Sequence, residues 1–175
     1  SFWRATFTSD NRDAESALAF LKSVPGVDGS RLYLVGHSFG GPQSLLLSTK
    51  RKVAGIVMLT STIRPTDELL VEQNKILMGL QGTSQSQIDD YISRLSSNLL
   101  EIKNNTFKCE FPFCSVIDGA EVYEQSIQLA WLKEVLQMNF TELSQNVKTP
   151  LLFLFGSSDC IIPESEYTIA LESLK

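Results

Sequence analysis

The sequence is poor in histidine and cysteine, which bind transition metals, and has fewer basic than acidic residues. It contains one histidine, His37, and neither paired histidines nor a two-plus-two cysteine arrangement, so we expect no metal site. Acidic residues outnumber basic ones by 20 to 15, which gives a formal net charge of −5. Because an acidic chain without a basic stripe offers few contacts to phosphates, we expect no nucleic-acid partner.

Long hydrophobic runs are also absent. The longest, residues 53–59 and 151–155, fall far short of the roughly 20 residues that a membrane helix needs, so we predict no membrane span. The 175 residues are 43% hydrophobic, which fits a folded domain with one sizeable core. The sequence begins at Ser1 without the charged and apolar regions of a secretory signal, and it leaves the oligomeric state open.

Cysteine is scarce, and its odd count leaves two interpretations. Cys109 and Cys114 could close a small disulfide loop in an oxidising compartment, with Cys160 left over. Alternatively all three are isolated thiols of an intracellular domain, which favours the cytoplasm. Asn104-Asn105-Thr106 and Asn139-Phe140-Thr141 fit the glycosylation sequon, but chance matches are common and neither decides the compartment.

The hydrophobic pattern predicts an α/β fold with a doubly wound parallel sheet. Continuous apolar runs typical of strands buried on both faces alternate with helical patterns. The expected strands are residues 31–35, 53–59 and 151–155, and the expected helices are 13–24, the segment after Gly40-Gly41, and the segment after Pro163.

The segment between the second and third strands has a different pattern. Apolar residues at helical spacing predict helices over 66–80, 84–103 and 123–138, and Ser84 with Gln87 forms a capping box. An insertion of this length reads as a helical lid or cap over the C-terminal edge of the sheet, or alternatively as an elaborated crossover without a role in the site.

Gly36-His37-Ser38-Phe39-Gly40 is the most specific motif in the chain. It matches G-x-S-x-G, with an apolar strand before it and a helix after it, as a nucleophile on a strand-to-helix turn requires. The turn strains Ser38, so that its hydroxyl projects from the sheet, and we expect Gly36 and Gly40 to be crowded together. The alternative is a tight turn of a nucleotide-binding fold, but the dinucleotide spacing is missing and we expect no cofactor.

Two long segments resemble serine hydrolases of the α/β-hydrolase superfamily. Residues 27–41 are similar to the nucleophile elbow of dienelactone-hydrolase-like and prolyl-oligopeptidase-like enzymes, and residues 149–163 to the strand that carries the acid of the catalytic triad. The insertion is more loosely similar to the cap of bacterial-type esterases. The resemblance covers essentially the whole chain, in the right order.

The resemblance implies roles for individual residues. Ser38 would be the nucleophile, and the backbone N–H of Phe39 one donor of the oxyanion hole. Asp159 would orient a histidine, and its place after a buried strand supports this role independently, although it could be a simple turn residue. Asp67 and Asp118 are poorer candidates because they lie in the insertion.

The family's catalytic histidine has no counterpart in this sequence. His37 directly precedes Ser38, where side chains of adjacent residues point apart, so we expect it to pack beside the site rather than act as the base. The family places its histidine after a further strand, whereas the residues after Asp159 read as one helix. Either the chain is an interior fragment of a longer hydrolase, which we favour, or it is a minimised, non-catalytic relative.

We therefore predict three segments: a hydrolase core with the elbow over 1–62, a helical cap over 63–140, and a core segment with the acid over 141–175. The expected function is hydrolysis of a small to medium apolar carboxylic ester through an acyl-enzyme on Ser38. His37, Met78 and Trp131 are candidates for the substrate pocket. Alternatives are a peptidase or thioesterase, or a non-catalytic interaction module.

Overall fold

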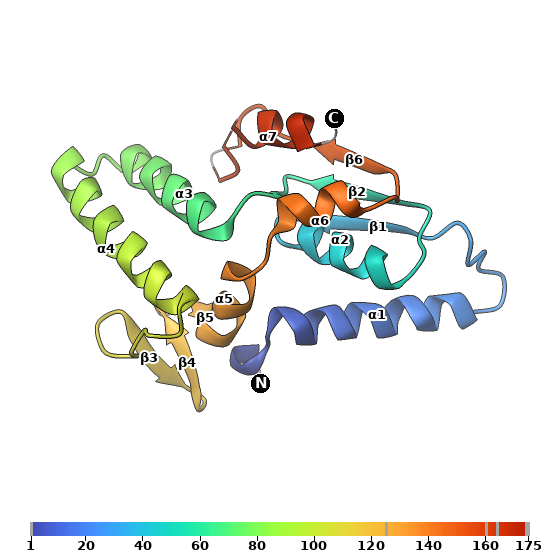
Figure 1. Cartoon of the computed structure of the whole chain (residues 1–175), viewed down its shortest axis with the longest axis horizontal. Helices are drawn as coiled ribbons and strands as arrows, with labels where there is room; N and C mark the ends of the chain where they lie inside the picture. The colour runs from blue at the N-terminus through green and yellow to red at the C-terminus, as the bar shows by residue number, and fades with distance from the viewer. Residues whose placement is uncertain (1, 125, 160, 164, 174–175) are drawn as a thin grey trace. The chain divides into compact units, whose positions relative to one another are not determined.

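A computed structural model describes residues 2–124, 126–159, 161–163 and 165–173 (Figure 1). The predicted thiol Cys160 lies outside the described residues. The chain divides into two compact units, one made of Ser1–Asp10 with Thr66–Met138 and the other of Asn11–Pro65 with Asn139–Lys175. We call them the insertion unit and the core unit and describe each by itself.

A parallel sheet of three strands forms the centre of the core unit. β2 (Gly55–Leu59) pairs with β1 (Tyr33–His37) on one side and with β6 (Leu151–Leu154) on the other. Segments nearly 100 residues apart in sequence are thus neighbours, and all three strands end at the same edge. The predicted parallel α/β architecture is confirmed.

Helix α2 (Gly40–Lys50) covers one face of this sheet. Its Leu45, together with Ile56 and Met58 of β2, is at most 1% exposed, so this face carries the core. On the other face Tyr33 and Val35 of β1 are 62% and 69% exposed. The expectation that the strands are buried on both faces is therefore wrong for the described residues, because apolar runs alone do not show which face has a covering helix.

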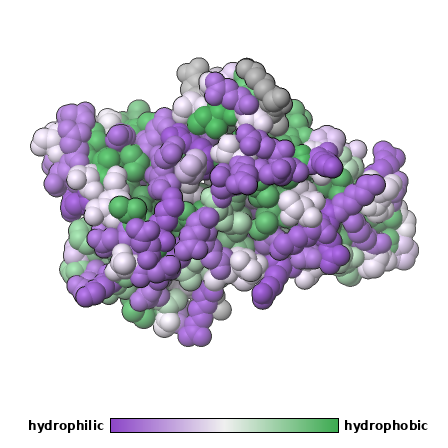
Figure 2. All heavy atoms as spheres, viewed as in Figure 1, coloured by the Kyte–Doolittle hydropathy of each residue, from purple (hydrophilic) through white to green (hydrophobic). Residues whose placement is uncertain are grey.

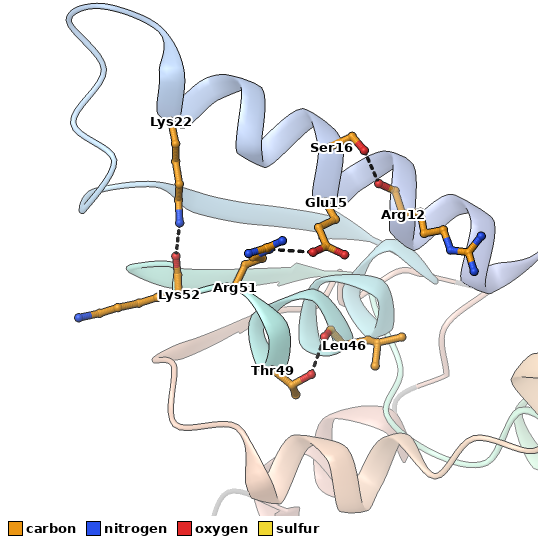
Figure 3. Close-up of polar contacts among 8 residues, drawn as sticks. All are labelled: Arg12, Glu15, Ser16, Lys22, Leu46, Thr49, Arg51 and Lys52. Carbon is orange, nitrogen blue, oxygen red and sulfur yellow. Dashed lines mark hydrogen bonds and ion pairs between the residues drawn. The ribbon is translucent and has the colours of Figure 1, made fainter.

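Helix α1 (Phe7–Ser23) begins six residues earlier than predicted. Thr6 and Ser9 satisfy each other's backbone N–H groups through their hydroxyls, at 2.9 and 3.1 Å, which is a capping arrangement that the sequence analysis missed. In the core unit α1 is joined to α2 by an Arg51–Glu15 ion pair of 2.7 Å (Figure 3). Lys22 adds a hydrogen bond from its ammonium group to the carbonyl of Lys52.

Two further helices complete the core unit. α6 (Phe140–Asn146) begins at Asn139, whose side chain accepts a hydrogen bond from the backbone N–H of Glu142. α7 (Ser165–Ser173) follows the loop after β6 and buries Ala170. The two helices contact each other, and α6 also contacts α2.

The insertion unit begins with two helices, as predicted. α3 (Thr66–Leu80) packs against α4 (Gln85–Lys103), whose stripe of apolar residues is buried: Ile88, Ile92, Leu95 and Leu99. The capping box of Ser84 and Gln87 is present, which confirms the predicted start of α4. Lys103 at the end of α4 forms a 3.0 Å ion pair with Asp67 of α3.

The prediction of a third helix over 123–138 is wrong for residues 123–128. An antiparallel sheet of β3 (Cys114–Ile117), β4 (Ala120–Tyr123) and β5 (Ile127–Gln128) precedes a shorter helix α5 (Leu129–Leu136). Asp118 and Gly119 join β3 to β4 with φ values of 51° and 74°, as a tight hairpin turn requires. This Asp-Gly pair was the overlooked sequence signal for the hairpin. The insertion therefore contains strands as well as helices.

The first ten residues belong to the insertion unit, whereas the sequence analysis assigned them to the core. The short 3₁₀ helix η1 (Phe2–Arg4) contacts β4, and the Arg4 guanidinium donates a hydrogen bond to the carbonyl of Asp118. The ring of Phe7, which is 1% exposed, lies edge-on to Trp131 at 6.2 Å. These partners lie more than a hundred residues away, beyond the reach of a local sequence pattern.

The surface alternates between polar and apolar side chains. In the face shown in Figure 2, hydrophilic residues predominate, with apolar residues distributed between them. Among the described residues, no helix combines the length and hydrophobicity that crossing a bilayer requires.

Candidate active site at the edge of the core sheet

Ser38 is the first residue after β1 and has a left-handed backbone conformation, with φ of 52°. Such a conformation is strained for any residue with a Cβ atom, and it persists only where the surrounding structure imposes it. Here the Ser38 N–H donates to the carbonyls of Leu59 and Thr60, at 3.1 and 3.2 Å. Its carbonyl accepts from the N–H of Gly41, at 3.1 Å.

A second residue fixes the carbonyl of Ser38 from outside the turn. The hydroxyl of Ser61, which is 1% exposed, donates a 2.6 Å hydrogen bond to it. Ser61 follows β2, so the turn after β1 is held by the loop after the neighbouring strand. Ser61 is not predictable from the sequence, because nothing in its local pattern distinguishes it from other loop serines.

The glycines of the turn differ from the expectation at one position. A Cβ atom on Gly36 would lie 2.2 Å from the carbonyl oxygen of Gly40, so only glycine fits there, as predicted. A Cβ on Gly40 would meet nothing within 4 Å, so the predicted crowding of its side-chain position is wrong. The second close approach is at Gly41, where a Cβ would lie 1.9 Å from the Ser61 hydroxyl.

Phe39 is the N-cap residue of α2, with helical dihedrals of −63° and −13°. The backbone N–H groups of a helix's first turn point out of its N-terminus, where the partial positive charge favours an anion. Ser38 and Phe39 therefore lie at the positive end of helix α2.

Asp159 lies in the loop that leaves β6, and its carboxylate is held by that loop. Its Oδ1 accepts hydrogen bonds from the backbone N–H groups of Ile161 and Ile162, at 2.8 and 3.0 Å. Its Oδ2 accepts none from the described residues. One oxygen thus fixes the carboxylate in place, while the other is available to a further donor.

Ser38 and Asp159 come from the same edge of one sheet. β2 lies between β1 and β6, so the axes of the strands that lead to the two residues are about 10 Å apart. The predicted nucleophile and the predicted acid therefore both follow strands that end at the same edge of the sheet.

His37 is exposed and does not pack beside Ser38, contrary to the expectation. It is paired in register with Leu59, on the sheet face that carries Tyr33 and Val35. Because neighbouring strand residues point to opposite faces, its imidazole belongs to the face away from α2.

Met78 and Trp131, the other residues predicted for the substrate pocket, belong to the insertion unit. Met78 is half-buried on α3, and half-buried Trp131 on α5 packs its ring against Phe7. Packing within that unit accounts for the position of Trp131.

An ion pair of the core unit joins the segment after β2 to the segment that follows the Asp159 loop. Arg64 lies 3.1 Å from the Oε1 atom of Glu166, and the two side chains are 12% and 1% exposed. The two charges of an ion pair buried to this extent depend on each other, because burying either charge without the other costs free energy. Neither residue has a role predicted from the sequence.

We expect Arg64→Met to lower the free energy of unfolding by about 3–5 kcal/mol, because it removes the guanidinium that pairs with the buried Glu166 carboxylate. The double variant Arg64→Met/Glu166→Leu removes both charges and should recover most of that loss. Urea unfolding of the three proteins checks this. Equal stability of wild type and Arg64→Met would contradict it.

Comparison with solved structures identifies the fold. The chain superposes on one of the metagenome-derived lipolytic enzymes LipS and LipT with a TM-score of 0.58 at 15% identity, over 98% of this chain and 60% of that one. The α/β hydrolase GrgF of Penicillium sp. sh18 matches with a TM-score of 0.57 at 17% identity, over 98% and 61%. The chain has the α/β-hydrolase fold.

A curated protein is similar to this chain in sequence. Esterase EstD of Thermotoga maritima is 25% identical over 173 residues, which are 97% of this chain and 37% of the esterase. The chain therefore spans little more than a third of that relative. No family model matches the sequence.

The described residues contain no group of three or more histidine, cysteine, aspartate or glutamate side chains arranged to hold a metal ion. The chemistry available at the sheet edge is that of a hydroxyl, a carboxylate and a helix N-terminus.

Proposed function

We propose that this chain supplies the nucleophile and the acid of a serine hydrolase that cleaves small carboxylic esters. The observation that carries the proposal is the strained backbone of Ser38, at the edge of the sheet where Asp159 also lies. The catalytic histidine comes from polypeptide outside residues 1–175, since the one histidine of the sequence lies on the sheet face away from α2.

In the proposed reaction the Ser38 hydroxyl attacks the carbonyl carbon of the ester, and its proton passes to the imidazole. The N–H of Phe39 donates to the resulting oxyanion. The carbon–oxygen bond to the alcohol then breaks, and the alcohol leaves with the proton from the imidazolium. Water attacks the acyl-enzyme by the same route, which releases the acid and restores Ser38.

Asp159 has an orienting role in this scheme. Its Oδ1 is fixed by two backbone N–H groups, so Oδ2 is positioned to accept the second N–H of the imidazole. This hydrogen bond selects the tautomer in which the other ring nitrogen faces the serine, and the carboxylate stabilises the imidazolium without taking its proton.

Several features support an ester as the substrate. EstD is an esterase, and the superposed enzymes include lipolytic ones.

We further propose that the insertion acts as a cap whose apolar residues, Met78 and Trp131 among them, line an acyl pocket.

Covalent labelling by a fluorophosphonate probe tests the proposal. We expect the natural protein that contains these residues to react at Ser38 and to lose the probe's fluoride, with the modified peptide identified by mass spectrometry. Residues 1–175 alone, lacking the base, should label far more slowly. The natural protein remaining unlabelled would refute the hydrolase and favour a non-catalytic interaction module.

A further inference from the structure

The end of helix α4 carries a glycosylation sequon in an exposed turn. Asn104 is the C-cap of α4, and Asn104, Asn105 and Thr106 are all exposed. The N–H of Thr106 bonds the carbonyl of Glu101 at 2.9 Å, and Asn105 has a left-handed φ of 58°, so the chain reverses direction here. The sequon therefore stands on a turn outside the helix, where a bulky group fits.

The side-chain amide of Asn104 makes no hydrogen bond with the described residues. The second sequon is different. The amide of Asn139 donates to the carboxylate of Glu142 at 3.2 Å while its oxygen caps α6. The middle residue, Phe140, is 1% exposed, and the Thr141 hydroxyl donates to the carbonyl of Ile63 at 2.7 Å. A glycan on Asn139 would interfere with a helix cap, whereas one on Asn104 displaces no contact.

An independent feature of the same segment points to an oxidising secretory compartment, where N-linked glycans are also added. Cys109 and Cys114 form a disulfide that begins five residues after Asn104. Protein disulfides form and persist in oxidising compartments, and N-linked glycans are added in the secretory pathway. The interpretation of these two cysteines as isolated thiols is wrong for this structure.

The surface next to the sequon also suits a carbohydrate. A hollow of about 530 Å³ in this part of the insertion unit is lined by Asn98, Thr106, Phe107 and Phe111, among others. Phe111 is 84% exposed at the tip of the disulfide loop. A glycan extending from Asn104 would cover this exposed aromatic surface with hydroxyl groups.

We propose that Asn104 is an N-linked glycosylation site and that the chain folds in an oxidising secretory compartment. In this modification a lipid-linked oligosaccharide pyrophosphate donates its sugar chain. The bond from the sugar's anomeric carbon to the pyrophosphate oxygen breaks, and that carbon bonds the Asn104 amide nitrogen. The amide gives up one proton, and the lipid pyrophosphate is the leaving group. The proposal is independent of the hydrolase activity.

The test uses the protein purified from its natural source. Trypsin cleaves after Lys103 and Lys108, so it isolates the Asn104 sequon, and the peptide that contains Asn139 is an internal control. Treatment with peptide N-glycosidase in heavy-oxygen water should convert Asn104, but not Asn139, to a labelled aspartate. Digestion without reduction should give one peptide, residues 109–133, that contains both cysteines and gains two hydrogens on reduction, because the disulfide lies within it.

Variants expressed in the natural host distinguish the effect of losing the sequon from the effect of changing the turn around it. Thr106→Ala should abolish the glycan at Asn104, and Asn105→Gly, which keeps the sequon and suits the positive φ, should retain it. An unmodified Asn104, an occupancy at Asn139 equal to or above that at Asn104, or free thiols at Cys109 and Cys114 would each overturn the proposal.

Discussion

Ser38→Ala is expected to lower kcat for ester hydrolysis by roughly 10⁶-fold in the natural protein, with little change in KM. The substitution removes the oxygen that forms the acyl-enzyme but none of the backbone hydrogen bonds that fix the turn, since these use the N–H and carbonyl of residue 38. Steady-state kinetics with a short-chain ester, together with loss of fluorophosphonate labelling, measures the effect.

The matched control for this prediction is Ser48→Ala on α2. Among the described residues the Ser48 hydroxyl donates only to the carbonyl of Leu45 within its own helix, so the substitution should leave kcat within about twofold. A Ser38→Ala protein that retains wild-type kcat would show that the nucleophile is another residue. Equal losses in the two variants would indicate a general effect on folding instead.

Gly36→Ala is expected to cause the second large effect, loss of the folded core unit. The added Cβ would lie 2.2 Å from the carbonyl oxygen of Gly40 and 2.4 Å from the backbone nitrogen of Gly41. Both atoms are backbone, so the turn itself must move. We expect the free energy of unfolding to fall by at least about 3 kcal/mol, beyond the typical cost of overpacking, as measured by urea unfolding.

Gly40→Ala provides the comparison within the same motif. Its Cβ would meet nothing within 4 Å, and alanine favours a helix over glycine. We therefore expect unchanged or slightly raised stability, by up to about 1 kcal/mol. Equal destabilisation by Gly36→Ala and Gly40→Ala would contradict the geometry of the turn, while a stable Gly36→Ala protein would show that its backbone relaxes.

Local features of the sequence were sufficient to predict the elements around Ser38. A continuous apolar run makes β1 and β2, and the small residues of the turn place α2 directly behind Ser38. The capping box at Ser84 and the stripe of α4 were likewise readable. These features depend on residues within a few positions of one another, so their physical cause is contained in the local sequence.

The insertion shows where local reasoning failed. The apolar residues of 123–138 fit a helical period, but Tyr123 pairs with Cys114 in a sheet. That pairing depends on the Asp118-Gly119 turn, which outweighed the local helical preference. The attachment of residues 1–10 to the insertion unit depends on similarly distant partners.

The sequence by itself determined the fold class and the identity of the candidate nucleophile and acid. Only the tertiary structure decided that Gly41 rather than Gly40 is the second crowded glycine, because the crowding comes from Ser61, on the loop after another strand. It also decided that Asp159 is fixed through one oxygen and that Arg64 neutralises Glu166. Contacts of this kind join segments that become neighbours only when parallel strands assemble, so no local pattern encodes them.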